Sequence, residues 1–161
     1  MRLSSKNGTS HLGVIKDVSK KDMPLKKDGW QFNWKELTKN KSNKFFGLYI
    51  DGEIQGMLAV ELAEQPDSIM FYLNLIEVAS NNYGSNGEYY EVAGCLLAYA
   101  CQLSANWLEK DNPYFGYVLF EAKTKLVERY QIKYGAELIG GQKMVFTPEQ
   151  GAILIKEYLD N

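Results

Sequence analysis

The pattern of apolar and polar residues along the chain predicts alternating strands and helices. Short runs rich in apolar, β-branched or aromatic residues predict strands, at residues 10–18, 45–50, 53–62, 69–78, 117–121, 136–140 and 142–146. Apolar residues that recur every three or four positions predict two longer helices, from Val92 to about Asp111 and from Lys123 to Tyr134. A short helix is expected over residues 31–39, and another opens at Thr147-Pro148-Glu149.

Local turn signals organise these elements into a mixed α/β fold. Asp51-Gly52 separates two strands and favours a tight type I′ hairpin, because both positions need a positive φ. Gly135 follows the second long helix and suits a left-handed C-cap. The run at residues 69–78 is continuously apolar, as a central strand covered on both faces should be. A strand-helix-strand crossover then joins this strand to the next within an otherwise antiparallel sheet.

Length and composition indicate one globular domain over residues 1–161. The chain is 45% hydrophobic and 13% aromatic, with 11 tyrosines, which argues against disorder and for a well-filled core. No apolar run is long enough to cross a membrane, and the N-terminus lacks the apolar core of a secretory signal. We therefore expect no membrane partner, and the expected compartment is the cytoplasm.

The few cysteines and histidines argue against several kinds of site. Cys95 and Cys101 are six residues apart on one predicted helix and point in different directions, so a disulfide between them is not expected. His11 is the single histidine and is distant from both in the sequence. We therefore expect no metal site and no Cys-His or Ser-His catalytic pair.

Charge is distributed unevenly, although the net formal charge is only −2. Residues 1–44 contain 11 Lys or Arg against 4 Asp or Glu, whereas residues 45–161 contain 7 against 16. One interpretation of the basic segment is a solvated surface, which is the usual fate of a run of charges. The other is a basic wall for an anionic ligand, or a weak nucleic-acid surface. Because no nucleic-acid-binding motif accompanies the segment, we do not expect nucleic acid as a partner.

A turn that contains glycine precedes the first long helix. The stretch GSNGEYYEVAGCLLAYA, residues 84–100, runs from a loop into an apolar helix, and it follows IEVA, residues 76–79, at the end of the predicted central strand. Unpaired N–H groups at a helix start, together with the helix dipole, form a site for an anion such as phosphate.

Further motifs extend this arrangement along the chain. They are LIEVA at residues 75–79 with Asn82, YYEVAG at 89–94, ACQLS at 100–104, GYV at 116–118, AKT at 122–124, and Tyr130 five residues before Gly135-Ala136. With the order of the elements, these motifs resemble the GNAT superfamily of acetyl-CoA-dependent N-acetyltransferases, and more closely a branch of small bacterial GNAT-like proteins. The resemblance covers roughly residues 30–160 and implies a mixed, mostly antiparallel central sheet flanked by helices.

The resemblance implies acetyl-CoA as co-substrate and an amine of unknown identity as acceptor. The residues that match the cofactor-binding positions are Val78, Ala79, Ser80, Glu91, Val92, Ala93, Gly94 and Cys95. In the family, N–H groups at the end of the central strand also bind the oxyanion where that strand splays from its neighbour, which implies the N–H groups of Val78, Ala79 and Ser80 here. The resemblance further implies that two copies can pair as a homodimer.

The same resemblance assigns two catalytic roles. Tyr130 matches the tyrosine that commonly protonates the departing thiolate, and Tyr134 is the fallback; a buried tyrosine is also an ordinary core residue. Glu77 is the candidate base, and Glu61 is a weaker choice. Alternatively, Glu77 accepts N–H groups from the loop near residues 81–82.

One residue departs from the family pattern. Glu91 occupies a position where the pattern has glycine. A carboxylate about 4 Å from a phosphate costs on the order of 4 kcal/mol at an effective dielectric near 20, which would weaken cofactor binding about a hundredfold or more. Alternatively, Glu91 is a favourable first-turn acid that points outward. Two functions therefore stay open: an acetyltransferase, and a non-catalytic GNAT-like interaction module with lost or weakened CoA binding.

Overall fold

The structure, a computed structural model that describes residues 1–161, is built on one eight-stranded sheet. The strands are β1 (Arg2–Ser4), β2 (Ser10–Asp17), β3 (Lys44–Ile50), β4 (Glu53–Gln65), β5 (Ser68–Val78), β6 (Val118–Glu121), β7 (Glu137–Gly140) and β8 (Lys143–Phe146). The helices are α1 (Trp34–Leu37), α2 (Val92–Trp107), α3 (Thr124–Tyr134) and α4 (Pro148–Tyr158). The strand order is β1-β2-β3-β4-β5-β6-β8-β7, and only β5 and β6 run parallel. The predicted mixed, mostly antiparallel sheet flanked by helices is confirmed.

Differences from the predicted elements fall at short or irregular segments. Strand β1 was not predicted, because three residues carry no periodic pattern; its pairing with β2 defines it. The helix expected over residues 31–39 is reduced to the single turn of α1, at which the Asn33 side chain accepts the N–H of Glu36. Helix α2 ends at Trp107 rather than near Asp111, because Leu108 is already extended.

Backbone geometry confirms both turn predictions. Asp51 and Gly52 have φ values of 51° and 85°, so the turn between β3 and β4 uses two positive φ angles, as a type I′ hairpin requires. Gly135 has φ 72° and donates its N–H to the carbonyl of Gln131 at 3.1 Å, which closes α3.

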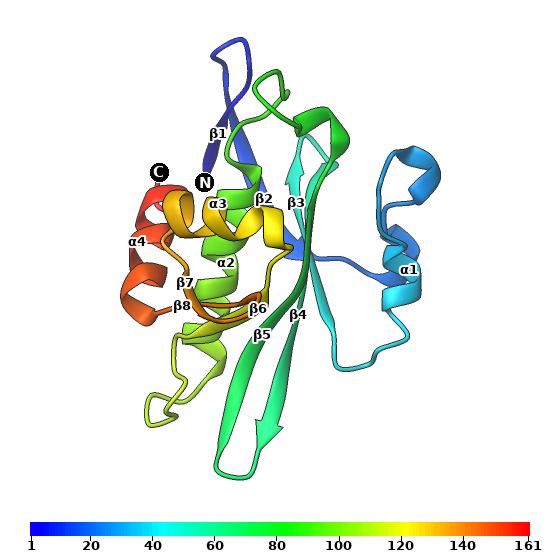
Figure 1. The fold of residues 1–161 in the computed structure, drawn as a ribbon. Coiled ribbons are helices and arrows are strands. Elements are labelled where there is room, and N and C mark those ends of the chain that lie inside the picture. Colours follow the sequence, from blue (N-terminus) through cyan, green and yellow to red (C-terminus); the bar gives the residue numbers. More distant parts are fainter.

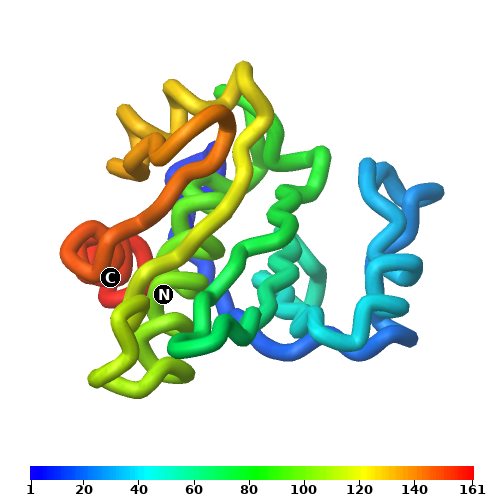
Figure 2. The backbone as a smooth tube through the Cα atoms, turned by 60° about the horizontal axis from the view of Figure 1, so that its bottom comes forward, coloured from blue at the N-terminus to red at the C-terminus, as the bar shows by residue number.

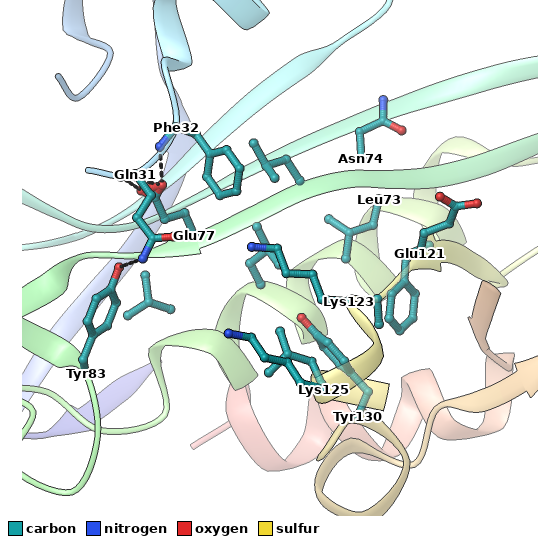
Figure 3. A pocket seen from close by; sticks show the side chains of 16 residues that line it. Gln31, Phe32, Leu73, Asn74, Glu77, Tyr83, Glu121, Lys123, Lys125 and Tyr130 are labelled. Atoms are coloured by element: carbon teal, nitrogen blue, oxygen red, sulfur yellow. Dashed lines mark hydrogen bonds between the residues drawn. The ribbon is translucent and has the colours of Figure 1, made fainter. Parts of the chain in front are cut away.

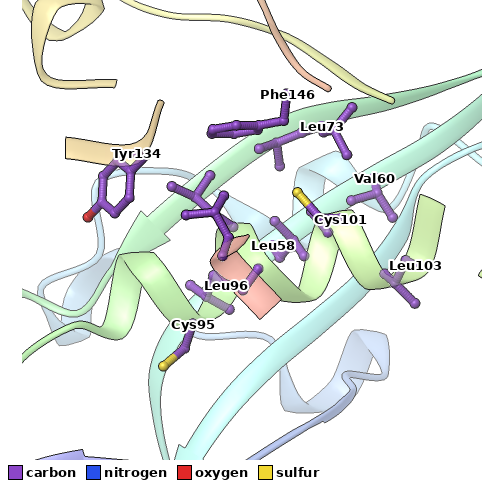
Figure 4. Close-up of a cluster of buried hydrophobic side chains, with 14 of the residues drawn as sticks. Leu58, Val60, Leu73, Cys95, Leu96, Cys101, Leu103, Tyr134 and Phe146 are labelled. Carbon is purple, nitrogen blue, oxygen red and sulfur yellow. The ribbon is translucent and has the colours of Figure 1, made fainter. Parts of the chain in front are cut away.

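Two layers cover the sheet. Helices α2, α3 and α4 lie on one side, and residues 18–43, here called the lobe, lie on the other (Figures 1 and 2). The main core contains 26 buried residues and lies largely between α2 and the sheet, and it includes Leu96 of α2 and Leu58 and Leu73 of the sheet (Figure 4). A smaller core of five buried residues, Trp34 among them, attaches the lobe. None of the helices combines the length and apolar character needed to cross a membrane.

The two ends of the chain meet beside β1 (Figure 1). The N–H of Arg2 donates to the side-chain oxygen of Asn161 at 2.7 Å, and the Asn161 amide donates back to the Arg2 carbonyl at 3.1 Å. The first strand and the last residue are therefore held by the same pair of hydrogen bonds.

A β-bulge opens the sheet at β5. The step from Ala59 to Val60 on β4 is matched by a step from Leu75 to Leu73 on β5, so Asn74 is an extra residue. A bulge bends the strand that carries it. Beyond it β5 and β6 separate, and they share a single ladder position (Figure 2).

The prediction that the strand at residues 69–78 is covered on both faces is wrong for its first half. Phe71 and Leu73, on one face, are buried, whereas Met70 and Tyr72, on the other face, are only partly buried, and Asn74 at the bulge is exposed. The lobe covers the second face only near the end of β5, where Leu75 packs against the smaller core. A long apolar run cannot by itself distinguish these two situations.

Candidate functional site

A cavity of about 350 Å³ lies where β5 and β6 separate (Figure 3). Its walls come from residues 73–78 of β5, residues 120–121 of β6, the first turns of α3, and Gln31 and Phe32 of the lobe. The bulge at Asn74 accounts for this opening, because a sheet paired to its ends would leave no space between two neighbouring strands.

Tyr130 points its hydroxyl into this cavity from α3 (Figure 3). Its ring packs edge-on against Phe120, with ring centroids 5.1 Å apart. Burial raises the pKa of the Tyr130 phenol above its ordinary value of 10.0; nearby Tyr134 adds to the rise and Arg129 opposes it. A phenol that stays protonated at neutral pH can act as a proton donor. Tyr134 is itself buried and lies against Tyr130 on one side and Tyr158 on the other.

Glu77 also borders the cavity, and the lobe binds its carboxylate (Figure 3). The side chain is buried and accepts the N–H of Gln31, at 3.1 and 3.2 Å to its two oxygens, and the N–H of Phe32 at 2.9 Å. A loop does supply N–H groups to Glu77, but it is the loop of the lobe and not the one near residues 81–82. The role of Glu77 as a base stays a prediction. Glu61 accepts a hydrogen bond from the Asn74 amide at 2.9 Å and does not line the cavity.

A second cavity, of about 610 Å³, lies at the start of α2. Glu91, Val92 and Ala93 line one side of it, and Arg129 and Lys133 of α3 line the opposite side. The N–H groups of Val92 and Ala93 have no hydrogen-bond partner, and no side chain caps the helix. Free N–H groups at the start of a 16-residue helix, facing two cations across a cavity, favour an anion.

The two cavities adjoin and share walls, and together they are here called the groove. Val78, Tyr83 and Leu126 line both of them. The groove therefore runs from the free N–H groups of α2 to the opening between β5 and β6, and the phenol of Tyr130 lies near its far end.

Tyr89 and Tyr90 line the groove without filling it. The ring of Tyr89 packs edge-on against His11, with ring centroids 5.2 Å apart. The hydroxyl of Tyr90 donates to the carbonyl of Ser85 at 3.4 Å. Neither tyrosine ring closes the cavity at the start of α2, which keeps its volume beside them.

The loop before α2 is anchored from both sides. From β1, the carbonyl of Ser4 accepts the N–H of Tyr90 at 3.0 Å. From within, the Asn82 side chain accepts the N–H of Tyr89 at 2.9 Å and donates to the side-chain oxygen of buried Gln55 at 3.0 Å. These bonds fix the position of the residues that open α2.

Glu91 is the N-cap of α2 and has φ 65° and ψ 16°. This left-handed conformation is uncommon for a residue with a side chain and suits glycine, the residue of the family pattern. The carboxylate turns toward α3, where an oxygen lies 3.2 Å from the Lys133 ammonium. Both side chains are partly exposed.

Among the three residues expected to supply oxyanion donors, Val78 has the most favourable position. The N–H of Ala79 donates to the Gln55 carbonyl at 2.9 Å. Because successive amides of a strand point in opposite directions, the N–H of Val78 points away from β4 and toward the opening. Ser80 lines neither cavity.

Gly94 and Cys95 face the interior rather than the groove. A Cβ added at Gly94 would lie 2.5 Å from the ring of Tyr158, so this glycine permits α4 to pack closely against α2. The thiol of Cys95 donates to the Tyr158 carbonyl at 3.5 Å, and burial raises its pKa to about 12. Cys95 and Cys101 are both free thiols.

Sequence reasoning missed Arg129 and Lys133. The signal was present, because positions 126, 129, 130 and 133 are spaced three or four residues apart and lie on one face of a helix. What the spacing does not reveal is that this face is opposite the start of α2.

No protein-family model and no curated protein matches this chain, but several solved structures do. AtaT, in its complex with AtaR and DNA, has a TM-score of 0.64 at 13% identity, over 88% of this chain and 99% of AtaT. Arabidopsis thaliana Naa50, with the bisubstrate analogue CoA-Ac-MVNAL, has a TM-score of 0.57 at 12% identity, over 84% and 98%. An aminoglycoside acetyltransferase from an uncultured soil metagenomic sample, with sisomicin, has a TM-score of 0.51 at 14% identity, over 75% and 84%.

The ligands in these structures are ligands of the neighbouring proteins. AtaT is known in complex with acetyl-CoA and also with acetyl-methionyl-tRNAfMet. The expectation that nucleic acid is not a partner therefore gains no support from the neighbours. At 10–14% identity the likeness establishes the architecture, and the protein has the fold of the GNAT acetyltransferases.

Proposed function

We propose that residues 1–161 form one domain that transfers an acetyl group from acetyl-CoA to an amine. The observation that supports this most directly is the groove, which joins unpartnered N–H groups at the start of α2 to the opening that Tyr130 faces. A diphosphate suits the first end, because the helix start and two cations favour negative charge there. The CoA ligands of AtaT and Naa50 support the same assignment by analogy of fold.

In this proposal, each end of the groove has a separate task. Acetyl-CoA supplies an activated thioester, and the N–H groups of Val92 and Ala93 hold its diphosphate. The N–H of Val78 donates to the thioester carbonyl as its oxygen gains negative charge. The acceptor nitrogen attacks the carbonyl carbon, the carbon–sulfur bond breaks, and Tyr130 gives its phenolic proton to the departing sulfur. The nitrogen releases a proton to Glu77 or to water, and Tyr130 regains a proton from solvent.

Acetyl-CoA is expected to stabilise the protein against heat. At about 100 times its dissociation constant, a ligand that binds only the folded state adds roughly 2.7 kcal/mol, which for a chain of this length raises Tm by about 5–10 °C. A thermal-shift titration measures this directly. An unchanged Tm up to millimolar acetyl-CoA would favour the alternative, a GNAT-like interaction module that does not use CoA.

Replacing Glu77 with glutamine tests the proposed base. The amide oxygen of the introduced side chain can still accept a lobe N–H, but neutral hydrogen bonds replace charge-assisted ones, so we expect a folded protein with a moderately lowered Tm. If Glu77 takes the proton of the acceptor, kcat falls about a hundredfold. Glu61→Gln is the matched control, because Glu61 lies outside the cavity, and its kcat should not change. An unchanged kcat for Glu77→Gln would limit Glu77 to anchoring the lobe.

A further inference from the structure

The groove contains one ion pair, between Glu91 and Lys133. The Lys133 ammonium lies 3.2 Å from one Glu91 oxygen and 3.4 Å from the other. Glu91 is the only acidic residue that lines the cavity at the start of α2, and Arg129 and Lys133 are the only basic ones. The cavity wall therefore carries one negative and two positive charges. The negative charge, on Glu91, is paired with one of the two cations, Lys133.

The pair is located where an anion would bind. Glu91 immediately precedes the free N–H groups of Val92 and Ala93, so its carboxylate competes with any anion for the same helix end. Lys133 belongs to another element, 42 residues further along the chain, and it reaches the site from the opposite wall. An anion seated between the two walls would lie next to Glu91 and also within the reach of the flexible Lys133 side chain.

We propose that Lys133 exchanges partners when the cofactor binds, from the Glu91 carboxylate to the cofactor diphosphate, with Arg129 as the second cation. This inference rests on the proposed function. The exchange relieves the repulsion between Glu91 and the diphosphate, because the released carboxylate is on a partly exposed side chain that can rotate into water. A phosphate oxygen is a good partner for an ammonium, since a charge-assisted hydrogen bond is stronger than a neutral one.

A simpler role for Lys133 makes a different prediction. If Lys133 stays on Glu91 and only neutralises it, the lysine matters solely because the glutamate is there. If it transfers to the diphosphate, it contributes to binding whether or not position 91 is acidic, and it contributes at least as much once Glu91 no longer competes for it. The two roles therefore predict different effects of removing Lys133 on cofactor affinity when the Glu91 charge is already absent.

The test is a double-mutant cycle with Lys133→Met and Glu91→Gln, measured as the Kd of acetyl-CoA by calorimetry. Methionine keeps an apolar stem, and glutamine removes the charge while retaining a side chain at the left-handed position. Lys156→Met on α4 is the matched control for losing one exposed positive charge. Acetyl-pantetheine is a second control, because it carries the thioester without a diphosphate.

Partner exchange predicts that Lys133→Met raises the Kd of acetyl-CoA about tenfold or more in the wild type, and by at least as much in the Glu91→Gln background. Lys156→Met should have no effect, and the affinity for acetyl-pantetheine should not depend on Lys133. If Lys133→Met weakens acetyl-CoA binding only in the wild-type background, Lys133 merely neutralises Glu91 and the proposal is overturned. An unchanged Kd in both backgrounds would overturn it as well. If the wild type binds no acetyl-CoA, the proposed function fails and this inference fails with it; binding that ignores Lys133 removes this inference alone.

Discussion

Replacing Tyr130 with phenylalanine is expected to lower kcat for acetyl transfer by about 10²- to 10⁴-fold, the usual range for loss of a general acid. The Kd of acetyl-CoA should change little, because the phenol lies at the end of the groove away from the start of α2. Phenylalanine keeps the ring that packs against Phe120, so the fold should be preserved. Steady-state kinetics with any accepted amine, together with calorimetry, measures both quantities.

Tyr134→Phe is the control for this substitution. Tyr134 is one helical turn further on, buried, and packed against Tyr158, and its loss should leave kcat largely unchanged. Burial raises the pKa of Tyr130 above 10.0, so ionisation of this phenol should not limit kcat below that pH. An unchanged kcat in Tyr130→Phe would remove Tyr130 from the acid role, and a fall in Tyr134→Phe instead would transfer the role to the fallback residue.

Replacing Glu91 with glycine is expected to strengthen both cofactor binding and the fold. Removal of the carboxylate beside the diphosphate should lower the Kd of acetyl-CoA about tenfold, less than full Coulomb repulsion gives because the side chain is partly exposed. Glycine also adopts φ 65° without steric cost, which should add about 1 kcal/mol to the free energy of unfolding. Calorimetry and thermal denaturation report the two effects separately.

Asp51→Gly separates the backbone effect from the charge effect. Asp51 is the other non-glycine residue with a positive φ, and it is in the turn between β3 and β4 and does not line the groove. We expect a smaller stabilisation than for Glu91→Gly, because aspartate tolerates the left-handed conformation and its replacement also removes its contact with His11 at 3.6 Å, and we expect an unchanged Kd for acetyl-CoA. Weaker binding in Glu91→Gly would show that the carboxylate contributes to the site rather than opposing it.

The parts of the fold that local chemistry dictates could be predicted from the sequence. Asp51-Gly52 needs only its own two φ angles to form a hairpin, and Gly135 needs only the helix before it. The long helix from Val92 has its periodicity within one segment. Together with the order of the elements, the motifs at the end of β5 and the start of α2 were enough to predict the mixed, mostly antiparallel sheet flanked by helices.

The site could be predicted less completely, because it depends on contacts between distant segments. One of the two interpretations had Glu77 accept N–H groups from the loop a few residues after it, but its partners are the N–H groups of Gln31 and Phe32, about 45 residues before it. Glu91 was expected either to repel the cofactor or to point outward, and no local rule reveals Lys133 opposite it. The bulge at Asn74 depends on register against β4, which a continuous apolar run does not reveal.

The hydrogen bonds between Arg2 and Asn161 have a practical consequence for protein engineering. Since the two ends of the chain touch, a few added residues could join them, and new ends could be cut at residues 66–67, the tip between β4 and β5. Such a circular permutant would keep every strand and helix whole. The chain would then no longer begin at β1. A label or a fusion partner could be attached at the new ends, away from the loop before α2 that β1 supports.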